Sequence, residues 1–367
     1  MPIVYHTSDT YNTTGGERDH AICGPEDQMT TPKTSRLRLI ASGLVLLYTL
    51  LVIGWAAAHR FVGDRFWLLA LANAFAVYLF APLPSAALLT VLARRRAAWI
   101  ALSTILLLFF GLFGGELIPP SPIARAEANG IGLTTMTYNV LFTTTDATPI
   151  AANIQSNDPD LVAFQELTPA LAQQLEQQIG TRYPFRTPVH AGCHADVAIW
   201  SRFPLQVEDV DPDVLCRVRP VVVDLGGRPV RVVDVHGWPF TSLRREGVEQ
   251  SLAWRQEQIE LVIDQFVLRP EPFILLGDLN STPMHEVYQT LAVHLVDTFR
   301  EAGWGLGHTY PATGGRLRGI PYPDRMVRID HVFHSEDWRA EAAWVGEWDG
   351  SSDHLPVVAR LRLLSAD

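Results

Sequence analysis

Lysine is nearly missing from this sequence, and the chain from residue 120 onward contains none. That stretch contains 20 arginines and 32 acidic residues, which gives it a formal net charge of −12. Sequence-independent binding to nucleic acid depends on basic side chains that displace counterions from phosphates. The composition therefore argues against a protein that holds duplex DNA through a broad basic surface.

Charged residues are also missing from three long apolar runs near the N-terminus, at residues 39–58, 66–93 and 97–115. Each run is long enough to cross a hydrocarbon core about 30 Å thick as a helix. Buried helices of a soluble protein are the alternative, but the runs leave no polar face to meet water. We expect membrane spans at about 39–58, 66–93 and 97–117. Pro82 and Pro84 indicate that the second span is kinked, or that it ends early as a re-entrant pair.

Basic residues around these runs predict the orientation. Lys33, Arg36 and Arg38 precede the first run, and Arg94–Arg96 separate the second from the third. Because cytoplasmic loops carry an excess of Lys and Arg, these segments are expected in the cytoplasm. We therefore expect a multi-pass protein of the cytoplasmic membrane with a disordered cytoplasmic tail (1–35), a membrane region (36–118), a linker (119–130) and an extracytoplasmic domain (131–365).

Cysteine is scarce as well, with Cys23, Cys193 and Cys216 the three in the chain. No cluster of cysteine and histidine indicates a zinc site. Cys23 falls in the predicted cytoplasmic tail, whereas the other two fall in the extracytoplasmic domain, where thiols can oxidise. We expect a Cys193–Cys216 disulfide, with two unpaired buried thiols as the alternative.

The stretch FILLGDLNSTP (residues 273–283) joins an apolar run suited to a buried strand with two polar residues, Asp278 and Asn280. Side chains at i and i+2 of a strand point to the same side. An acid and an amide would then emerge together at the end of a strand. The simpler interpretation is a strand that runs into an Asp/Asn turn.

Other apolar segments end in polar residues in the same way. The chemistry-bearing residues at these ends are Asn139 (LTTMTYNVLF), Glu166 (DPDLVAFQEL), His236 (VRVVDVHGWP), Asp330 (RIDHVF), Asp353 and His354 (SSDHLPVVARLRL). Taken singly, each has a structural explanation, such as a turn cap, the first acid of a helix or a satisfied histidine. Between them, residues 243–267 show apolar positions at helical spacing, which predicts a helix covering one face of a sheet.

In this order, the segments resemble the endonuclease/exonuclease/phosphatase superfamily of metal-dependent phosphodiesterases. The resemblance covers roughly residues 133–363, and FQEL, GDLN, RIDHVF and SSDHLPV carry it. It implies an α/β catalytic domain built as a four-layered α/β/β/α sandwich, here preceded by the three membrane helices. The superfamily includes deoxyribonucleases, abasic-site endonucleases, sphingomyelinases and inositol-polyphosphate 5-phosphatases, so the motifs are much less specific for a substrate.

The resemblance also implies roles. Glu166 would hold a divalent cation, Mg²⁺ with Mn²⁺ as the alternative, with Asn139 close by and Asp353 completing the site. Oxygen ligands suit such a hard cation. Asp278 would orient or deprotonate the attacking water, or protonate the leaving oxygen. Asn280 and His236 would hold phosphate oxygens, and His354, backed by Asp330, would act as general base or as a cationic stabiliser.

The sequence departs from DNA-binding relatives in its loops. Those relatives usually carry basic and aromatic residues around the site, whereas residues 207–216 here are acidic. Residues 304–330 are the exception, being rich in aromatic residues and arginine. We therefore expect a membrane-anchored phosphoesterase acting on a lipid head group or a small phosphodiester. An extracytoplasmic nuclease and a catalytically silent, anchored binding module are the alternatives.

Overall fold

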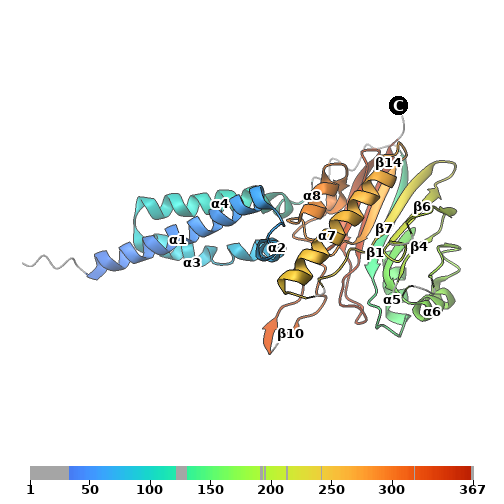
Figure 1. Cartoon of the computed structure of the whole chain (residues 1–367), viewed down its shortest axis with the longest axis horizontal. Helices are drawn as coiled ribbons and strands as arrows, with labels where there is room; N and C mark the ends of the chain where they lie inside the picture. The colour runs from blue at the N-terminus through green and yellow to red at the C-terminus, as the bar shows by residue number, and fades with distance from the viewer. Residues whose placement is uncertain are drawn as a thin grey trace, which may run out of the picture.

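The computed structural model describes residues 33–120, 130–190, 193, 196–211, 214–240, 242–317 and 319–364. Most of the predicted tail and linker lies outside the described residues. The N-terminal part is a helical block, which forms the narrow arm on the left of Figure 1. It consists of α1 (Lys33–Val62), α2 (Trp67–Ala74), the 3-10 helix η1 (Ala76–Phe80), α3 (Leu83–Ala93) and α4 (Arg96–Leu117).

Three helical stretches of this block are long and apolar enough to cross a membrane: Arg36–Val62, Ala76–Ala93 and Arg96–Leu117. The second predicted run, 66–93, is therefore divided, because α2 is a separate helix and Pro82 lies at the junction of η1 and α3. The short α2 lies where the block meets the rest of the chain (Figure 1). Many large apolar side chains of the block point outward, including Leu107 and Ile100.

The remainder forms a C-terminal domain (residues 130–364) around two mixed six-stranded sheets. The first sheet has the order β13 (Trp338–Val345), β14 (Val357–Leu364), β1 (Gly130–Asn139), β2 (Leu161–Leu167), β4 (Asp196–Ser201), β3 (Phe185–Arg186). The second has the order β5 (Leu205–Val207), β6 (Val218–Asp224), β7 (Pro229–Val235), β8 (Phe273–Asp278), β12 (Asp330–His334), β9 (Val296–Asp297). A separate hairpin, β10 (Gly315–Leu317) with β11 (Ile320–Tyr322), projects from the domain (Figure 1).

The two sheets pack face to face through apolar side chains such as Leu161 and Leu361 on one sheet and Val232 and Leu276 on the other. Helices α5 (Thr148–Asn157) and α6 (Pro169–Ile179) cover the outer face of the first sheet. The outer face of the second sheet is covered by helix α7 (Arg245–Val262), the π-helical turn η3 (Ile263–Val267) and helix α8 (Glu286–Ala292). Helix α9 (Thr298–Ala302) packs beside β12 and β13. The predicted four-layered α/β/β/α sandwich is confirmed, and α7 with η3 corresponds to the helix expected at 243–267.

The helical block is docked directly on the C-terminal domain. Asp64 accepts a hydrogen bond from the Glu286 backbone N–H at 2.7 Å, at the first turn of α8. His285 Nε2 lies 3.2 Å from the carbonyl oxygen of Ala70. Met284 packs in an apolar cluster with side chains of the block. These contacts fix the domain close to the ends of the apolar helices.

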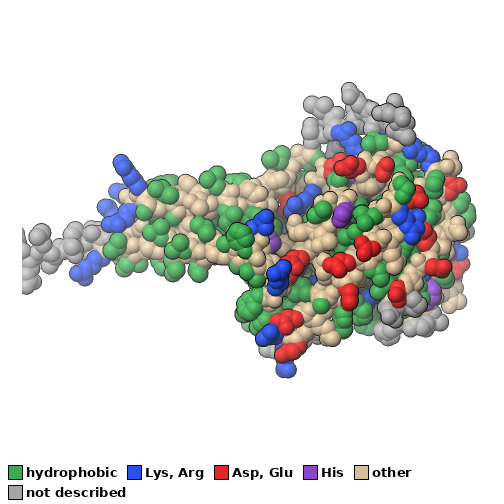
Figure 2. All heavy atoms as spheres, turned by 45° about the horizontal axis from the view of Figure 1, so that its top comes forward, with side chains coloured by type: hydrophobic (Ala, Val, Ile, Leu, Met, Phe, Trp, Pro, Cys, Tyr) green, Lys and Arg blue, Asp and Glu red, His purple; other side chains and the backbone are tan. Residues whose placement is uncertain are grey.

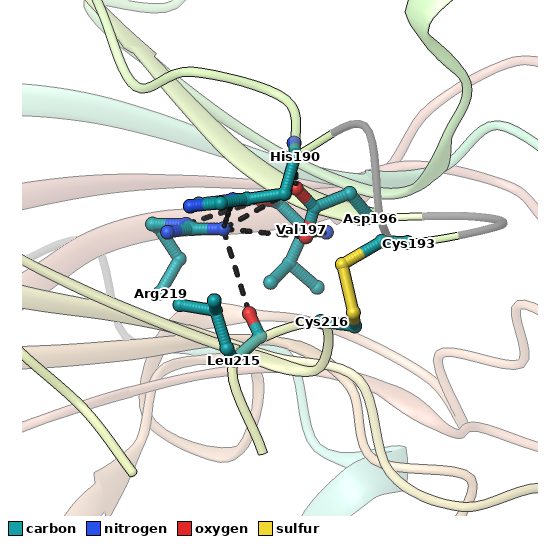
Figure 3. Close-up of a disulfide and its surroundings, with 7 residues drawn as sticks. All are labelled: His190, Cys193, Asp196, Val197, Leu215, Cys216 and Arg219. Atoms are coloured by element: carbon teal, nitrogen blue, oxygen red, sulfur yellow. Dashed lines mark hydrogen bonds and ion pairs between the residues drawn. A yellow bond between two sulfur atoms is a disulfide. The ribbon is translucent and has the colours of Figure 1, made fainter. Parts of the chain in front are cut away.

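A disulfide joins Cys193 to Cys216, whose Cα atoms lie 5.6 Å apart (Figure 3). Beside it, the buried Arg219 guanidinium contacts both Asp196 carboxylate oxygens at 3.3 Å and His190 Nδ1 at 2.8 Å. The covalent bond and this polar cluster hold the segment before β6 against the start of β4.

Removing the disulfide is expected to destabilise the domain. The bond closes a loop with a sequence separation of 23, so a Cys193→Ser/Cys216→Ser variant should lose about 3 kcal/mol of unfolding free energy. Urea unfolding of the detergent-solubilised chain, followed by tryptophan fluorescence, measures the change. Cys23→Ser is the control and should behave as the parent. An unchanged urea midpoint in the double variant, with the parent insensitive to reductant, would contradict the assignment.

Candidate active site

Six strand ends of the two sheets meet at one edge of the sandwich. Asn139 is the last residue of β1 and Glu166 lies near the end of β2, which runs parallel to β1. Asp278 ends β8, and His236 directly follows β7, its parallel neighbour. The antiparallel strands reach the same edge with their beginnings: Asp330 begins β12 opposite Asp278, and Asp353 and His354 precede β14. The topology therefore brings all the predicted site residues to one edge, including Asn280 two residues beyond β8.

Asn139 links the carboxylates of two different sheets. Its side-chain amide donates to Glu166 Oε1 at 3.2 Å and to Asp278 Oδ2 at 3.1 Å, while its Oδ1 accepts from the Leu141 N–H. The other Glu166 oxygen accepts from the Phe142 N–H at 3.0 Å. Asn139 thus presents donors toward the acids, and it aligns Glu166 with Asp278.

Asp278 is the central acid of the site and is almost fully buried. Its Oδ2 also accepts from the Asn280 side-chain amide at 3.2 Å and lies 3.7 Å from His354 Nε2. Burial raises the pKa of Asp278, and the positive charge of His354 opposes that effect. The Asn280 amide also donates to the Gly237 carbonyl at 3.0 Å, which fixes its orientation.

His354 is held by Asp330. His354 Nδ1 lies 2.9 Å from Asp330 Oδ2, so its Nε2 is left to face Asp278. Burial alone would lower the pKa of His354, but the carboxylates of Asp330 and Asp278 outweigh it and raise the pKa. Tyr310 packs against the imidazole, with ring centroids 4.8 Å apart. The histidine is therefore fixed in position and favours its charged form in this arrangement.

Two buried polar atoms at the site have no hydrogen-bond partner in the described part of the chain, namely His236 Nε2 and Asp353 Oδ1. His236 Nε2 lies between two acids, 3.7 Å from Glu166 Oε1 and 3.9 Å from Asp278 Oδ2. Burial lowers the pKa of His236, as do Arg217 and His354, which favours the neutral imidazole. Burial raises the pKa of Asp353, and repulsion from Glu166 adds to this increase, although His354 opposes it. Unsatisfied buried groups of this kind mark a place where a ligand or ion completes the bonding.

Two sets of side chains could hold a cation. Asp278, Asp330 and His354 offer ligand atoms within 4.8 Å of one another. In that set, however, His354 Nδ1 is already bonded to Asp330. Glu166 and Asp353 are acids with no ion-pair partner other than neutral His236 among the described residues, and their oxygens match the preference of Mg²⁺. The geometry groups the first set, whereas the assignment of the cation to Glu166 and Asp353 stays a prediction from the sequence.

The backbone is unusual at three positions of the site. Leu141, Glu166 and Asn280 have φ values of +59°, +58° and +50°. This left-handed region is unfavourable for residues with a side chain, by roughly 1 kcal/mol or more each. Glu166 also lies in an irregular stretch of the β2–β4 pairing, between Phe164 and Leu167. Neighbouring contacts hold the acid in this strained conformation, a feature that strand periodicity does not predict.

Arg217 is a further residue of the site that the sequence did not point to. Its guanidinium carbon lies 3.9 Å from the ring centroid of Trp238, and its carbonyl accepts from the His236 N–H at 2.8 Å. Burial lowers the pKa of Arg217, but Asp278 and Glu166 favour its charge. No carboxylate lies within salt-bridge distance of it in the described residues.

The family model for the endonuclease/exonuclease/phosphatase family matches residues 136–354. Among solved structures, truncated TDP2 from Caenorhabditis elegans is 17% identical over 64% of this chain and 100% of that chain, with a TM-score of 0.50. An endonuclease/exonuclease/phosphatase from Beutenbergia cavernae is 24% identical over 64% and 72% of the two chains, with a TM-score of 0.47. Sphingomyelinase C from Streptomyces griseocarneus is 22% identical over 63% and 99%, with a TM-score of 0.46.

No curated protein sequence matches the chain. At these sequence identities the solved structures support only the assignment of the fold. The similarity to TDP2 agrees with the two packed sheets described above. The family model is the more informative match, since it covers more than half of the chain and includes every residue of the site from Asn139 to His354. On these grounds the chain belongs to the endonuclease/exonuclease/phosphatase family.

Proposed function

We propose that this protein is a membrane-anchored, Mg²⁺-dependent phosphoesterase whose C-terminal domain works outside the cytoplasmic membrane. The observation that carries the proposal is the gathering of Glu166, Asp278, His236 and His354 at one edge, with buried polar atoms left unsatisfied between them. The three apolar helices support the anchor, and the disulfide supports an oxidising compartment. The predicted boundaries at 36–118 and 131–365 belong to the same proposal.

Glu166 and Asp353 are the residues proposed to hold the cation, which when bound neutralises charge on the phosphate oxygens. Asn139 aligns Glu166 with Asp278 through the two hydrogen bonds of its amide. Asp278 orients the attacking water and accepts its proton. His236 and Asn280 hold the non-bridging oxygens, and His354, oriented by Asp330, places a donor and a positive charge at the phosphorus.

A phospholipid head group or a small phosphodiester is favoured over DNA. The loop that borders His354 through Tyr310 is also attached to the helical block: Tyr78 donates to the Met326 carbonyl at 3.0 Å, and Trp304 Nε1 donates to the Leu117 carbonyl at 3.3 Å. The site is therefore held near the bilayer, which raises the effective concentration of lipid substrates. The acidic balance of the domain disfavours the alternative of a nuclease.

The full-length protein in detergent, assayed with Mg²⁺, tests this. Phospholipid vesicles, a bis-aryl phosphodiester and linear DNA are offered separately, each with and without EDTA. We expect EDTA-sensitive hydrolysis of the small diester or the phospholipid and little of the DNA. Hydrolysis of DNA alone would establish the nuclease, and no hydrolysis with any divalent metal would favour the silent binding module.

Arg217 is expected to contribute to substrate binding. Arg217 lies near Glu166 and Asp278, and no carboxylate among the described residues is within salt-bridge distance of it, so it is suited to pair with a phosphate. Arg217→Gln should lower kcat/KM for a small diester by about tenfold to a hundredfold, and Arg217→Lys by less. Arg245→Gln is the control, because Arg245 is exposed on α7 and pairs with Glu249. An unchanged kcat/KM in Arg217→Gln would show that Arg217 does not contribute to substrate binding.

A further inference from the structure

A cavity of about 560 Å³ lies where the helical block meets the C-terminal domain. Its wall is formed by the end of α1 and the following turn, by α4 near Gly111, and by residues of α8 and α9. None of the site residues described above lines it. Figure 2 shows basic side chains at this junction, with acidic ones beside them, whereas the middle of the helical arm shows no charged side chains on this face.

The cavity has an excess of positive charge. Arg60 and Arg65 line it and take part in no ion pair within the described ranges. Arg300 also lines it and is paired with Glu116 at 3.4 Å. The carboxylate in the lining is Glu286, which accepts from the Asp64 N–H at 3.2 Å. His59 adds a buried Nδ1 that has no hydrogen-bond partner among the residues that the structure describes. The wall therefore holds three guanidinium groups against one carboxylate, and that carboxylate is in no ion pair with Arg60 or Arg65 among the described residues.

The cavity lies at the end of an apolar helix. The stretch Arg36–Val62 ends within its wall, and Phe61, beside Arg60, is 82% exposed. In a helix that crosses a bilayer, an arginine at the helix end buries its apolar stem and extends its charge toward the head groups. If the block is anchored as proposed above, the cavity opens at head-group level on the side of the C-terminal domain.

We propose that this cavity binds the head group of an anionic phospholipid, with its phosphate paired to Arg60 and Arg65. Arginine binds phosphate through charge-assisted hydrogen bonds that are frequently bidentate. The acyl chains would lie along the outward-facing apolar side chains of α1 and α4. The bound lipid would join the block to α8 and α9, and it would strengthen the docking of the C-terminal domain. The inference rests on the membrane anchoring, but not on catalysis.

Lipid binding is tested on the full-length protein in detergent with EDTA, so that metal-dependent hydrolysis does not occur. The probes are phosphatidylglycerol, phosphatidylcholine and inorganic phosphate, and the readouts are the lipid adduct in native mass spectrometry and the thermal midpoint. We expect an adduct and a raised midpoint with phosphatidylglycerol alone. Arg60→Gln/Arg65→Gln should weaken phosphatidylglycerol binding by about tenfold or more. Arg94→Gln/Arg95→Gln, with the same charge change at the other end of the block, should retain it.

A steric variant tests the cavity without removing charge. A Cβ at Gly111 would meet no heavy atom within 4 Å, so Gly111→Phe can fill the cavity. Gly54→Phe is its control, since Gly54 has equal space elsewhere. We expect Gly111→Phe to lose phosphatidylglycerol binding and Gly54→Phe to retain it. His354→Ala should also retain phosphatidylglycerol binding, which would distinguish binding in this cavity from binding in the active site. The proposal would be overturned if phosphatidylcholine or phosphate gave the same response as phosphatidylglycerol. It would also be overturned if Arg60→Gln/Arg65→Gln and Gly111→Phe both bound phosphatidylglycerol as the parent does.

Discussion

Glu166→Ala is expected to lower the turnover of the hydrolysed phosphodiester by about a hundredfold or more. Glu166 holds its position through three contacts: the Asn139 amide and the Phe142 N–H bond its two oxygens, and His236 Nε2 lies 3.7 Å away. Together with Asp353, it is proposed to supply the negative charge that holds a divalent cation at this edge. Removing it leaves Asp353 to hold the cation alone, so both metal affinity and turnover should fall.

Glu166→Gln separates charge from shape, because the amide keeps the size of the side chain and can still accept the Phe142 hydrogen bond. We expect this variant to lose nearly as much turnover as the alanine variant and to need a higher Mg²⁺ concentration. Glu257→Ala, on the exposed face of α7, is the matched control. Initial rates over a Mg²⁺ titration measure the effect. Parent-like rates and parent-like Mg²⁺ dependence in Glu166→Gln would show that Glu166 does not hold the metal.

The convergence of the site could be predicted because it depends on local rules. Asn139, Glu166 and Asp278 each lie at the carboxyl end of an apolar strand, and the ends of parallel strands meet at one edge. The contact between β1 and β8 then places residues from two sheets side by side. An apolar run that ends in an acid or an amide can therefore be recognised in the sequence alone, and it predicts a site residue at a strand end.

Other features depend on packing between distant segments, and the sequence did not show them. Arg217 reaches the site because a loop folds its guanidinium over Trp238, a contact across 21 positions of the chain. The docking of Asp64 on α8 joins residues 222 positions apart and follows no periodicity. The left-handed φ of Glu166 is imposed by tertiary contacts, since its own type disfavours that conformation. The hydrophobic pattern predicted three long apolar helical stretches, but not the separation of α2 from α3.

His354→Ala is expected to lower turnover by about a hundredfold or more, because it removes both the donor that faces Asp278 and a positive charge at the phosphorus. The imidazole depends on Asp330, whose carboxylate lies 2.9 Å from Nδ1 and sets which nitrogen faces the substrate. Asp330→Asn should therefore lower kcat as well, although the histidine is still present. The control is His294→Ala, an exposed histidine outside the site.

The double variant Asp330→Asn/His354→Ala decides how the pair works. If Asp330 acts through the imidazole, removing the imidazole removes the contribution of both, and the double variant should be no slower than His354→Ala. The double-variant cycle is measured as kcat on a small phosphodiester at saturating Mg²⁺, with thermal unfolding to confirm that each protein is folded. Losses that multiply would mean that Asp330 acts independently of His354, for example by holding the cation with Asp278 in the three-residue group whose ligand atoms lie within 4.8 Å. The cycle thus distinguishes a histidine–aspartate pair from a second metal-binding arrangement of the same residues.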